Sequence, residues 1–148
     1  MEIAIIADDN KKELMIQFCI AYCGILSKHN LRATSDIGKY ISDATGLEID
    51  TLMSGLREGK QQIALCIAYD EVDLLLYFRD TDHTRETDDV EDNLLRMCDA
   101  HNVPVATNIA TAEALICALA RGDLDWREIV NPRSEYNVKR REKSQGAK

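Results

Sequence analysis

Carboxylate side chains follow two short apolar runs of this chain, close to the points where the runs end. Asp8 and Asp9 follow the run at 3–6 (Ile-Ala-Ile-Ile), and Asp80 follows the run at 72–78 (Val-Asp-Leu-Leu-Leu-Tyr-Phe). Carboxylates in such positions can transfer protons or hold a divalent cation. Alternatively, an acid at the start of a helix has only a structural role, in which it interacts favourably with the helix dipole.

Hydroxyl, glycine and cationic residues gather in three further places. They are Thr34, Ser35 and Gly38 in one loop, Ser54, Gly55 and Lys60 in a second, and Lys12 after the first acidic pair. Hydroxyl groups and backbone amides at a helix start bind anions such as phosphate, with a lysine as counter-charge. Asp36 opposes this interpretation, because a carboxylate beside a phosphate repels it by roughly 4 kcal/mol per charge pair at intermediate dielectric. A flexible surface loop explains the second segment nearly as well.

Short apolar runs alternate with longer segments of helical periodicity. We predict strands at 3–6, 31–34, 47–53 (or extended chain), 72–78 and 103–107, and helices at 11–28, 38–45, 61–69, 89–101 and 112–121, the last capped by Thr111. Because parallel strands need crossover connections, this order predicts a single-domain α/β fold, a doubly wound parallel sheet flanked by helices. Ligands bind such sheets outside the carboxyl ends of the strands. The loops that begin at Asp8, Thr34, Ser54, Asp80 and Thr107 should therefore meet at one edge.

Length and charge restrict the kind of protein. The chain has 148 residues, 45% hydrophobic and 30% charged, which fits one domain at 1–132 followed by a basic tail at 133–148. The formal charge of −8 argues against nucleic acid as a partner. Because we find neither an apolar run of ~18 residues nor a signal-peptide pattern, we expect a cytoplasmic protein with no membrane partner. The five cysteines lie in apolar segments, which predicts buried free thiols. We predict no metal site and no cofactor.

Seven stretches of the chain carry a resemblance to a known family. They are 3–12 (IAIIADDNKK), 44–47 (ATGL), 53–55 (MSG), 61–62 (QQ), 78–80 (FRD), 94–96 (LLR) and 103–112 (VPVATNIATA). Over residues 2–132 the chain resembles the methylglyoxal synthases, lyases that eliminate phosphate from dihydroxyacetone phosphate. The resemblance implies a methylglyoxal synthase-like fold and a homo-oligomer, a hexamer. It also implies that Lys12, Thr34, Ser54 and Gly55 bind the substrate phosphate, and that Asp80 is an active-site aspartate.

Other positions differ from the family's pattern. The Ala-His-Asp loop of the family appears as Ala-Asp-Asp at 7–9, so that Asp8 replaces a histidine. The aspartate that serves the family as catalytic base is replaced by Lys60, and a histidine expected after Asp80 is replaced by Thr87. The candidate catalytic positions are therefore Asp80, Asp8 and Lys60. A protonated lysine is a poor base unless burial lowers its pKa by several units, so these differences predict weak lyase activity.

Three functions remain open from the sequence. The preferred one is a relative that has lost or greatly weakened the lyase reaction and binds a phosphorylated or anionic small metabolite as a regulatory module. The second is an active methylglyoxal synthase that uses Asp80 or Asp8 as its base, so whether the chain is an enzyme stays open. In the third, the acids Asp8, Asp9, Asp36 and Asp80 converge on Mg²⁺ or form internal salt bridges with Lys12 and Lys60. Salt bridges are the preferred version, because the lysines are equally close in sequence.

Overall fold

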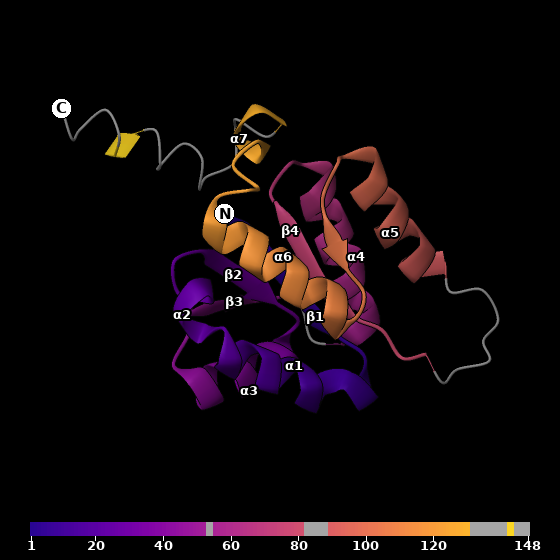
Figure 1. Ribbon diagram of the computed structural model, residues 1–148. Coiled ribbons are helices and arrows are strands. Elements are labelled where there is room, and N and C mark those ends of the chain that lie inside the picture. Colours follow the sequence, from indigo (N-terminus) through magenta and orange to yellow (C-terminus); the bar gives the residue numbers. More distant parts are fainter. Residues whose placement is uncertain (53–54, 82–88, 131–141, 144–148) are drawn as a thin grey trace.

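Five parallel strands form one sheet in the order β3-β2-β1-β4-β5 (Figure 1). The computed structural model describes residues 1–52, 55–81, 89–130 and 142–143. All six residues of β1 are buried, which fits a central strand with helices on both of its faces. The strands are β1 (Glu2–Ala7), β2 (Asn30–Ala33), β3 (Ile49–Thr51), β4 (Leu74–Phe78) and β5 (Val105–Ala106). This topology confirms the predicted doubly wound parallel sheet.

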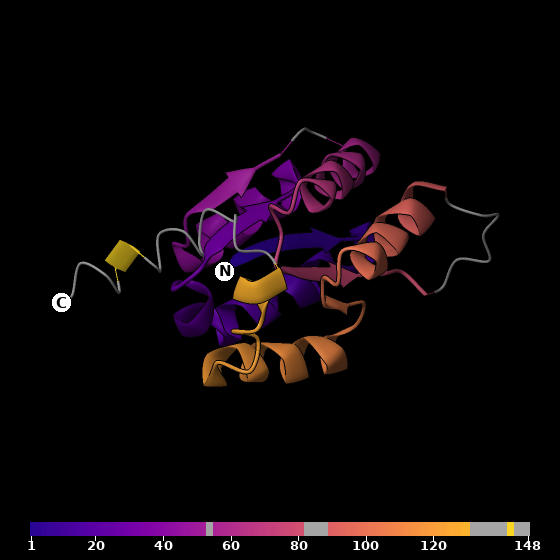
Figure 2. The same ribbon diagram turned by 90° about the horizontal axis from the view of Figure 1, so that it is seen from above.

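Helices cover both faces of the sheet, as the view from above shows (Figure 2). Successive side chains of β1 point to opposite faces. Ile3 and Ile5 join the apolar cluster of α1, α3 and α6, whereas Ala4 and Ile6 join that of α4 and α5. The helices of the first layer are α1 (Lys12–Ala21), α3 (Ser35–Thr45) and α6 (Ile109–Arg121); those of the second are α4 (Leu56–Ala68) and α5 (Asp89–Ala100).

Several predicted boundaries were wrong, and most of the errors lie at helix starts. The predicted helix at 11–28 is divided into the 3-10 turn η1 (Asp9–Lys11), α1 and the short α2 (Cys23–Leu26). Helices α3, α4 and α6 begin about one turn earlier than predicted. The cap of α6 is Asn108, whose side chain accepts a hydrogen bond from the backbone N–H of Thr111, so the predicted cap was misplaced. Polar residues of first helical turns were therefore mistaken for loop.

A buried arginine holds the short helix α7 (Arg127–Val130), which the sequence did not predict, against the amino edge of the sheet. Arg127 is 1% exposed and donates hydrogen bonds to the carbonyl oxygens of Val72 (3.2 Å) and Asn102 (2.5 Å). Its Nε lies 3.5 Å from Oδ1 of Asp73. A buried guanidinium needs such partners, because an unpaired charge in the interior is costly.

The five cysteines lie in described segments and are free thiols, as predicted. Cys19 and Cys98 are buried, Cys23 and Cys66 are partly buried, and Cys117 is exposed, so the prediction of burial is confirmed for two of the five and wrong for Cys117. Burial raises the pKa of the Cys19 thiol to about 12. None of the helices in the described part of the chain has the length and apolar character that crossing a membrane requires.

Candidate functional site

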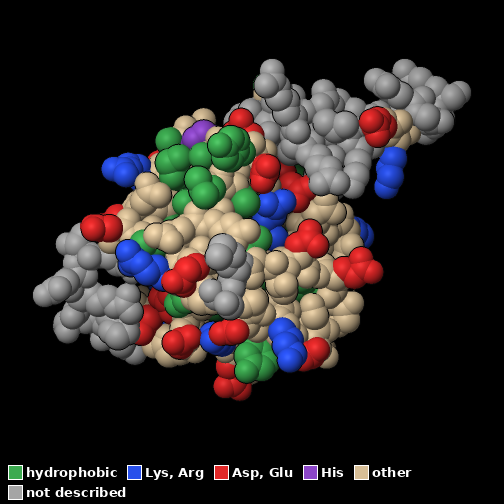
Figure 3. Space-filling view, turned by 180° about the vertical axis from the view of Figure 1, so that it is seen from behind, with side chains coloured by type: hydrophobic (Ala, Val, Ile, Leu, Met, Phe, Trp, Pro, Cys, Tyr) green, Lys and Arg blue, Asp and Glu red, His purple; other side chains and the backbone are tan. Residues whose placement is uncertain are grey.

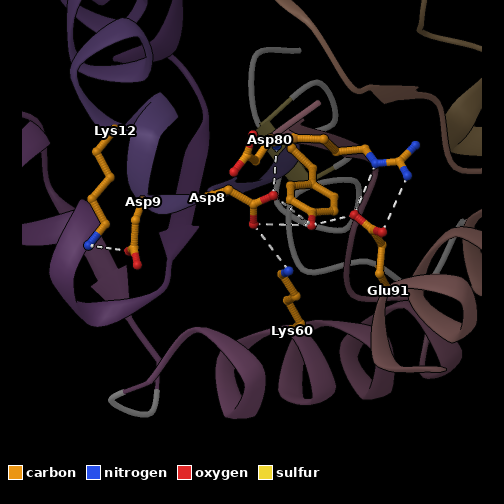
Figure 4. A network of polar contacts seen from close by, with 8 residues as sticks. Asp8, Asp9, Lys12, Lys60, Asp80 and Glu91 are labelled. Atoms are coloured by element: carbon orange, nitrogen blue, oxygen red, sulfur yellow. Dashed lines mark hydrogen bonds and ion pairs between the residues drawn. The ribbon is translucent and has the colours of Figure 1, made fainter. Parts of the chain in front are cut away.

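The predicted site residues that the structure describes follow the carboxyl ends of β1, β2, β3 and β4, where the strand-to-helix connections meet. They form two neighbouring groups. One surrounds Lys12 beside a cavity, and the other surrounds a buried contact between Asp8 and Lys60 (Figure 4). Asp8 and Asp9 are adjacent in the chain, so the turn that follows β1 contributes to both groups.

The first group lines a cavity of about 210 Å³. It brings together Lys12, Thr34, Ser35 and Gly55, which are four of the five residues predicted to bind phosphate. The fifth, Ser54, lies outside the described residues. Helix α3 begins at Ser35 and α4 begins just after Gly55, so the amino ends of two helices face the cavity. Unpaired N–H groups and the helix dipole make such ends favourable for anions.

Thr34 presents a hydroxyl group that is not bonded by any residue the structure describes. It is 5% exposed, lines the cavity, and makes no side-chain capping bond although it occupies the N-cap position of α3. Within the described residues, its hydroxyl has no hydrogen-bond partner. Because the residue lines the cavity, this hydroxyl is available to a bound molecule.

Lys12 is the cation of the cavity, and it has two carboxylate partners. Its Nζ lies 3.1 Å from Oδ1 of Asp9 and 3.7 Å from Oδ2 of Asp36. The hydrogen bond to Asp9 raises the pKa of Lys12, against the opposing effect of burial. Both carboxylates are largely exposed, with side-chain exposures of 86% and 68%. The lysine is therefore charged, and its counterions are free to rearrange at the mouth of the cavity.

Gly55 adopts a backbone conformation that other residues rarely adopt. Its φ of +98° lies in the region that favours glycine, and a Cβ at this position would collide with the carboxylate of Glu58. The turn into α4 therefore requires glycine, and this turn shapes one side of the cavity.

The second group is a buried ion pair. Nζ of Lys60 lies 3.2 Å from Oδ1 of Asp8, and the two side chains are 5% and 9% exposed. The other carboxylate oxygen of Asp8 accepts a hydrogen bond from the backbone N–H of Asp80 (2.8 Å). The ring of Tyr77 lies 4.9 Å from the ammonium group. Each carboxylate oxygen of Asp8 thus has a donor, as a buried charge requires.

Tyr77 extends this group toward the surface. Its hydroxyl donates to Oε1 of Glu91 at 2.7 Å and also lies 3.3 Å from Oδ1 of Asp8. Glu91 accepts two further bonds from Arg79, from Nε at 2.9 Å and from a terminal nitrogen at 3.2 Å. Burial, followed by the bond to Glu91, raises the pKa of Tyr77 far above its usual value. The cations Lys60 and Arg79 thus pair with the carboxylates of Asp8 and Glu91 on either side of a neutral hydroxyl.

The predicted catalytic residues are joined to one another. Asp8 and Lys60 form the buried ion pair, and Asp80 is attached to it through its backbone N–H. Sequence reasoning missed Tyr77, Arg79 and Glu91. Tyr77 was counted as an apolar strand residue, and the acidic first turn of α5 was the one available signal for Glu91. Thr87, which stands where the family pattern has a histidine, falls outside the described residues.

Three of the four acids considered as a cation site are divided between two lysines. Asp8 contacts Lys60, while Asp9 and Asp36 contact Lys12. Among the residues that the structure describes, no group of three or more His, Cys, Asp or Glu side chains is arranged to hold a metal ion. The salt-bridge version of the third hypothesis matches these contacts.

A larger cavity, of about 540 Å³, lies at the opposite edge of the sheet. Its lining includes Glu2, His29, Arg32 and Asp50, near the amino ends of β1 and β2. The carboxyl edge is where ligands of parallel α/β sheets bind. Size alone therefore does not make the larger cavity the site.

Comparison with known proteins places the chain in one family. A scan against family models gave no match. The chain is 54% identical to a methylglyoxal synthase of Caldicellulosiruptor saccharolyticus over 137 residues, which cover 93% of this chain and 97% of that one. It is 50% identical to a methylglyoxal synthase of Oceanobacillus iheyensis over 135 residues, covering 91% and 96%.

Comparison with solved structures points to the same family. A crystal structure of methylglyoxal synthase from Elizabethkingia anophelis matches with a TM-score of 0.70 at 33% identity, over 78% of this chain and 76% of that one. The resemblance noted in the sequence is thereby confirmed at the level of the family. On identity, coverage and fold together, the chain belongs to the methylglyoxal synthase family.

Proposed function

We propose that this chain binds a phosphorylated or anionic small metabolite in the cavity beside Lys12, as a regulatory or binding module with lost or greatly weakened lyase activity. The observation that carries the proposal is the difference between the two groups of the site. The phosphate-type residues line a cavity, whereas Asp8 and Lys60, which the resemblance assigns to catalysis, are bonded to each other in a buried cluster.

The chemistry of the family explains why that difference matters. A base must take the proton next to the carbonyl of dihydroxyacetone phosphate, a polarising group must stabilise the enediolate, and phosphate then leaves. Lys60 stands at the position of the base, and its ammonium group is held by Asp8 and by the ring of Tyr77. A missing general base costs about 10²–10⁴-fold in rate. The ion pair therefore supports a slow reaction or none.

The cavity supports binding of an anion. Thr34 contributes the hydroxyl of a largely buried residue, Lys12 a cation, and the amino ends of α3 and α4 contribute backbone N–H groups. A volume of about 210 Å³ is below the ~300–1,000 Å³ of sites for drug-sized molecules, which favours a small ligand.

Calorimetry with inorganic phosphate and with dihydroxyacetone phosphate tests the binding role. We expect both to bind to the full chain and both to bind more weakly to Lys12→Met. Lys39→Met, which removes the same charge from an exposed position of α3, is the matched control and should bind as the parent does. No heat of binding at millimolar ligand with the parent would contradict the proposal.

The second candidate is an active methylglyoxal synthase in which Asp80 or Asp8 acts as the base. The identity of 54% over 93% of the chain to a protein named methylglyoxal synthase favours it. In this case the parent would release phosphate and methylglyoxal from dihydroxyacetone phosphate, and Asp80→Asn would abolish the reaction. Turnover that survives both Asp80→Asn and Asp8→Asn would exclude these two bases.

Self-association as a homo-oligomer, a hexamer by family resemblance, is part of the same proposal. The face formed by α4 and α5 carries gathered hydrophobic side chains (Figure 3). On α4, Leu65 and Tyr69 are 61% and 76% exposed. Exposed apolar groups that lie together support a protein contact. Light scattering after size exclusion would measure the mass in solution, and a monomer at micromolar concentration would contradict this part.

A further inference from the structure

The cavity beside Lys12 carries more negative than positive charge. Among the described residues that line it, Lys12 is the one cation, whereas Asp9 and Asp36 are two carboxylates. The formal charge of the lining is therefore −1, and both acids are in contact with the lysine. The amino ends of α3 and α4, each equivalent to about half a positive charge, together offset about one unit, so the cavity has no surplus of positive charge for a dianion.

An ordinary phosphate ester meets an obstacle in such a site. Its dianion needs the ammonium group of Lys12, and it then lies within a few ångströms of two carboxylates that have lost their partner. The two acids are largely exposed, so solvent weakens the repulsion without removing it. Simple dianions should therefore bind weakly.

A ligand with its own cation avoids this obstacle through an exchange of partners. Its phosphate would take Lys12 and the hydroxyl of Thr34, while its ammonium group would take the carboxylates of Asp36 and Asp9. Every charge then keeps an opposite partner. The two acids stand at the mouth of the cavity, where their exposed side chains can rotate to meet a ligand.

We infer that the cavity prefers a small phosphorylated amine, a phosphate monoester with a primary ammonium group, and that Asp36 and Asp9 determine this preference. The inference rests on the proposed anion-binding role of the cavity and goes further by naming the ligand class. Asp36 contributes because it lies in the first turn of α3, directly after the phosphate-type residues Thr34 and Ser35.

Two probes that differ in the amine alone test the preference. We would titrate the full chain at pH 7 with phosphoethanolamine and with ethyl phosphate in a calorimeter. Two exposed ion pairs support a preference of about tenfold for phosphoethanolamine. In Asp36→Asn the preference should shrink to about threefold or less, and ethyl phosphate should bind more tightly than it does to the parent.

Asp43→Asn is the matched control. It removes the same charge from an exposed position of the same helix, and it does not line the cavity. The parent's preference should remain unchanged in this variant. Asp9→Asn provides a second test at the other carboxylate, and thermal melts would confirm that every variant is folded.

The outcomes separate this inference from the proposed function. If ethyl phosphate binds the parent as tightly as phosphoethanolamine does, the inference is wrong and the anion-binding role stands. A preference that persists in both Asp36→Asn and Asp9→Asn also overturns it. If neither probe binds to the parent or to Asp36→Asn at millimolar concentration, the anion-binding role itself is wrong.

Discussion

Replacement of Lys60 by methionine tests the buried ion pair at the centre of the account. Methionine fills a similar volume, but it leaves the carboxylate of Asp8 buried without its cation. Asp8 would retain the hydrogen bond from the backbone N–H of Asp80 and lose its one ammonium partner. We expect a large loss of stability, because an uncompensated charge in the interior is far more costly than the pair.

The magnitude follows from the separation and burial of the two groups. At 3.2 Å and an effective dielectric constant of ~20, the attraction of the pair is about 5 kcal/mol. Removal of one partner from buried pairs typically costs about 3–5 kcal/mol. For a chain of this size, a loss of ~4 kcal/mol lowers the melting temperature by roughly 8–16 °C.

Urea denaturation of a double-mutant cycle provides the assay. The parent, Lys60→Met, Asp8→Asn and the double variant would be compared, and we expect a coupling energy of at least ~2 kcal/mol. Arg121→Met is the control for an exposed pair, because Arg121 and Asp123 are 65% and 51% exposed and contribute at most ~1 kcal/mol. A Lys60→Met variant within ~1 kcal/mol of the parent, or a coupling energy near zero, would refute the reasoning.

Three further predictions concern the backbone, the sheet edge and pH. Gly55→Ala should lower the free energy of unfolding by roughly 1–3 kcal/mol and weaken phosphate binding, because alanine is strained at a φ of +98° and its Cβ meets the Glu58 side chain. Gly24→Ala is the control: it has open space around it and should change little in urea denaturation. Arg127→Met should cost about 3–5 kcal/mol by the same measurement, because it removes a buried guanidinium that contacts the buried carboxylate of Asp73. A loss below ~1 kcal/mol would contradict the importance of that buried contact. Burial lowers the pKa of His29 to about 4 from its ordinary value of 6.5. As the pH falls, the unfolded chain therefore binds a proton at this residue before the folded chain does. The free energy of unfolding should fall as the pH drops from 6.5 to 4. Titration of His29 by NMR with a pKa near 6.5 would disprove this.

Much of the fold was predictable because the two central strands are continuous apolar runs. The near-continuous burial of β1 and β4 left a strong signal, and the alternation of strands with helices restricted the topology to a parallel sheet. The helix starts were less predictable. In α3 and α4 the first turn contains serine, aspartate, arginine and glutamate, whose polarity also suits a loop, so that composition alone does not locate the boundary.

The site was predictable in part for a related reason. Thr34, Ser35, Gly55 and Lys12 follow strand ends, and the geometry of a parallel sheet brings strand ends together. Which acid pairs with which lysine was not predictable. Asp8 and Asp9 are neighbours in sequence, yet one contacts Lys60 and the other contacts Lys12. Which lysine each acid contacts depends on the directions in which the Asp8 and Asp9 side chains point after β1, and no sequence pattern indicates those directions.

Turnover of dihydroxyacetone phosphate by the purified chain, measured beside the methylglyoxal synthase of Caldicellulosiruptor saccharolyticus under the same conditions, is the most direct test of the central claim. The bonded pair of Asp8 and Lys60 predicts a kcat/KM at least ~100-fold lower for this chain. Equal rates of methylglyoxal formation would contradict that claim.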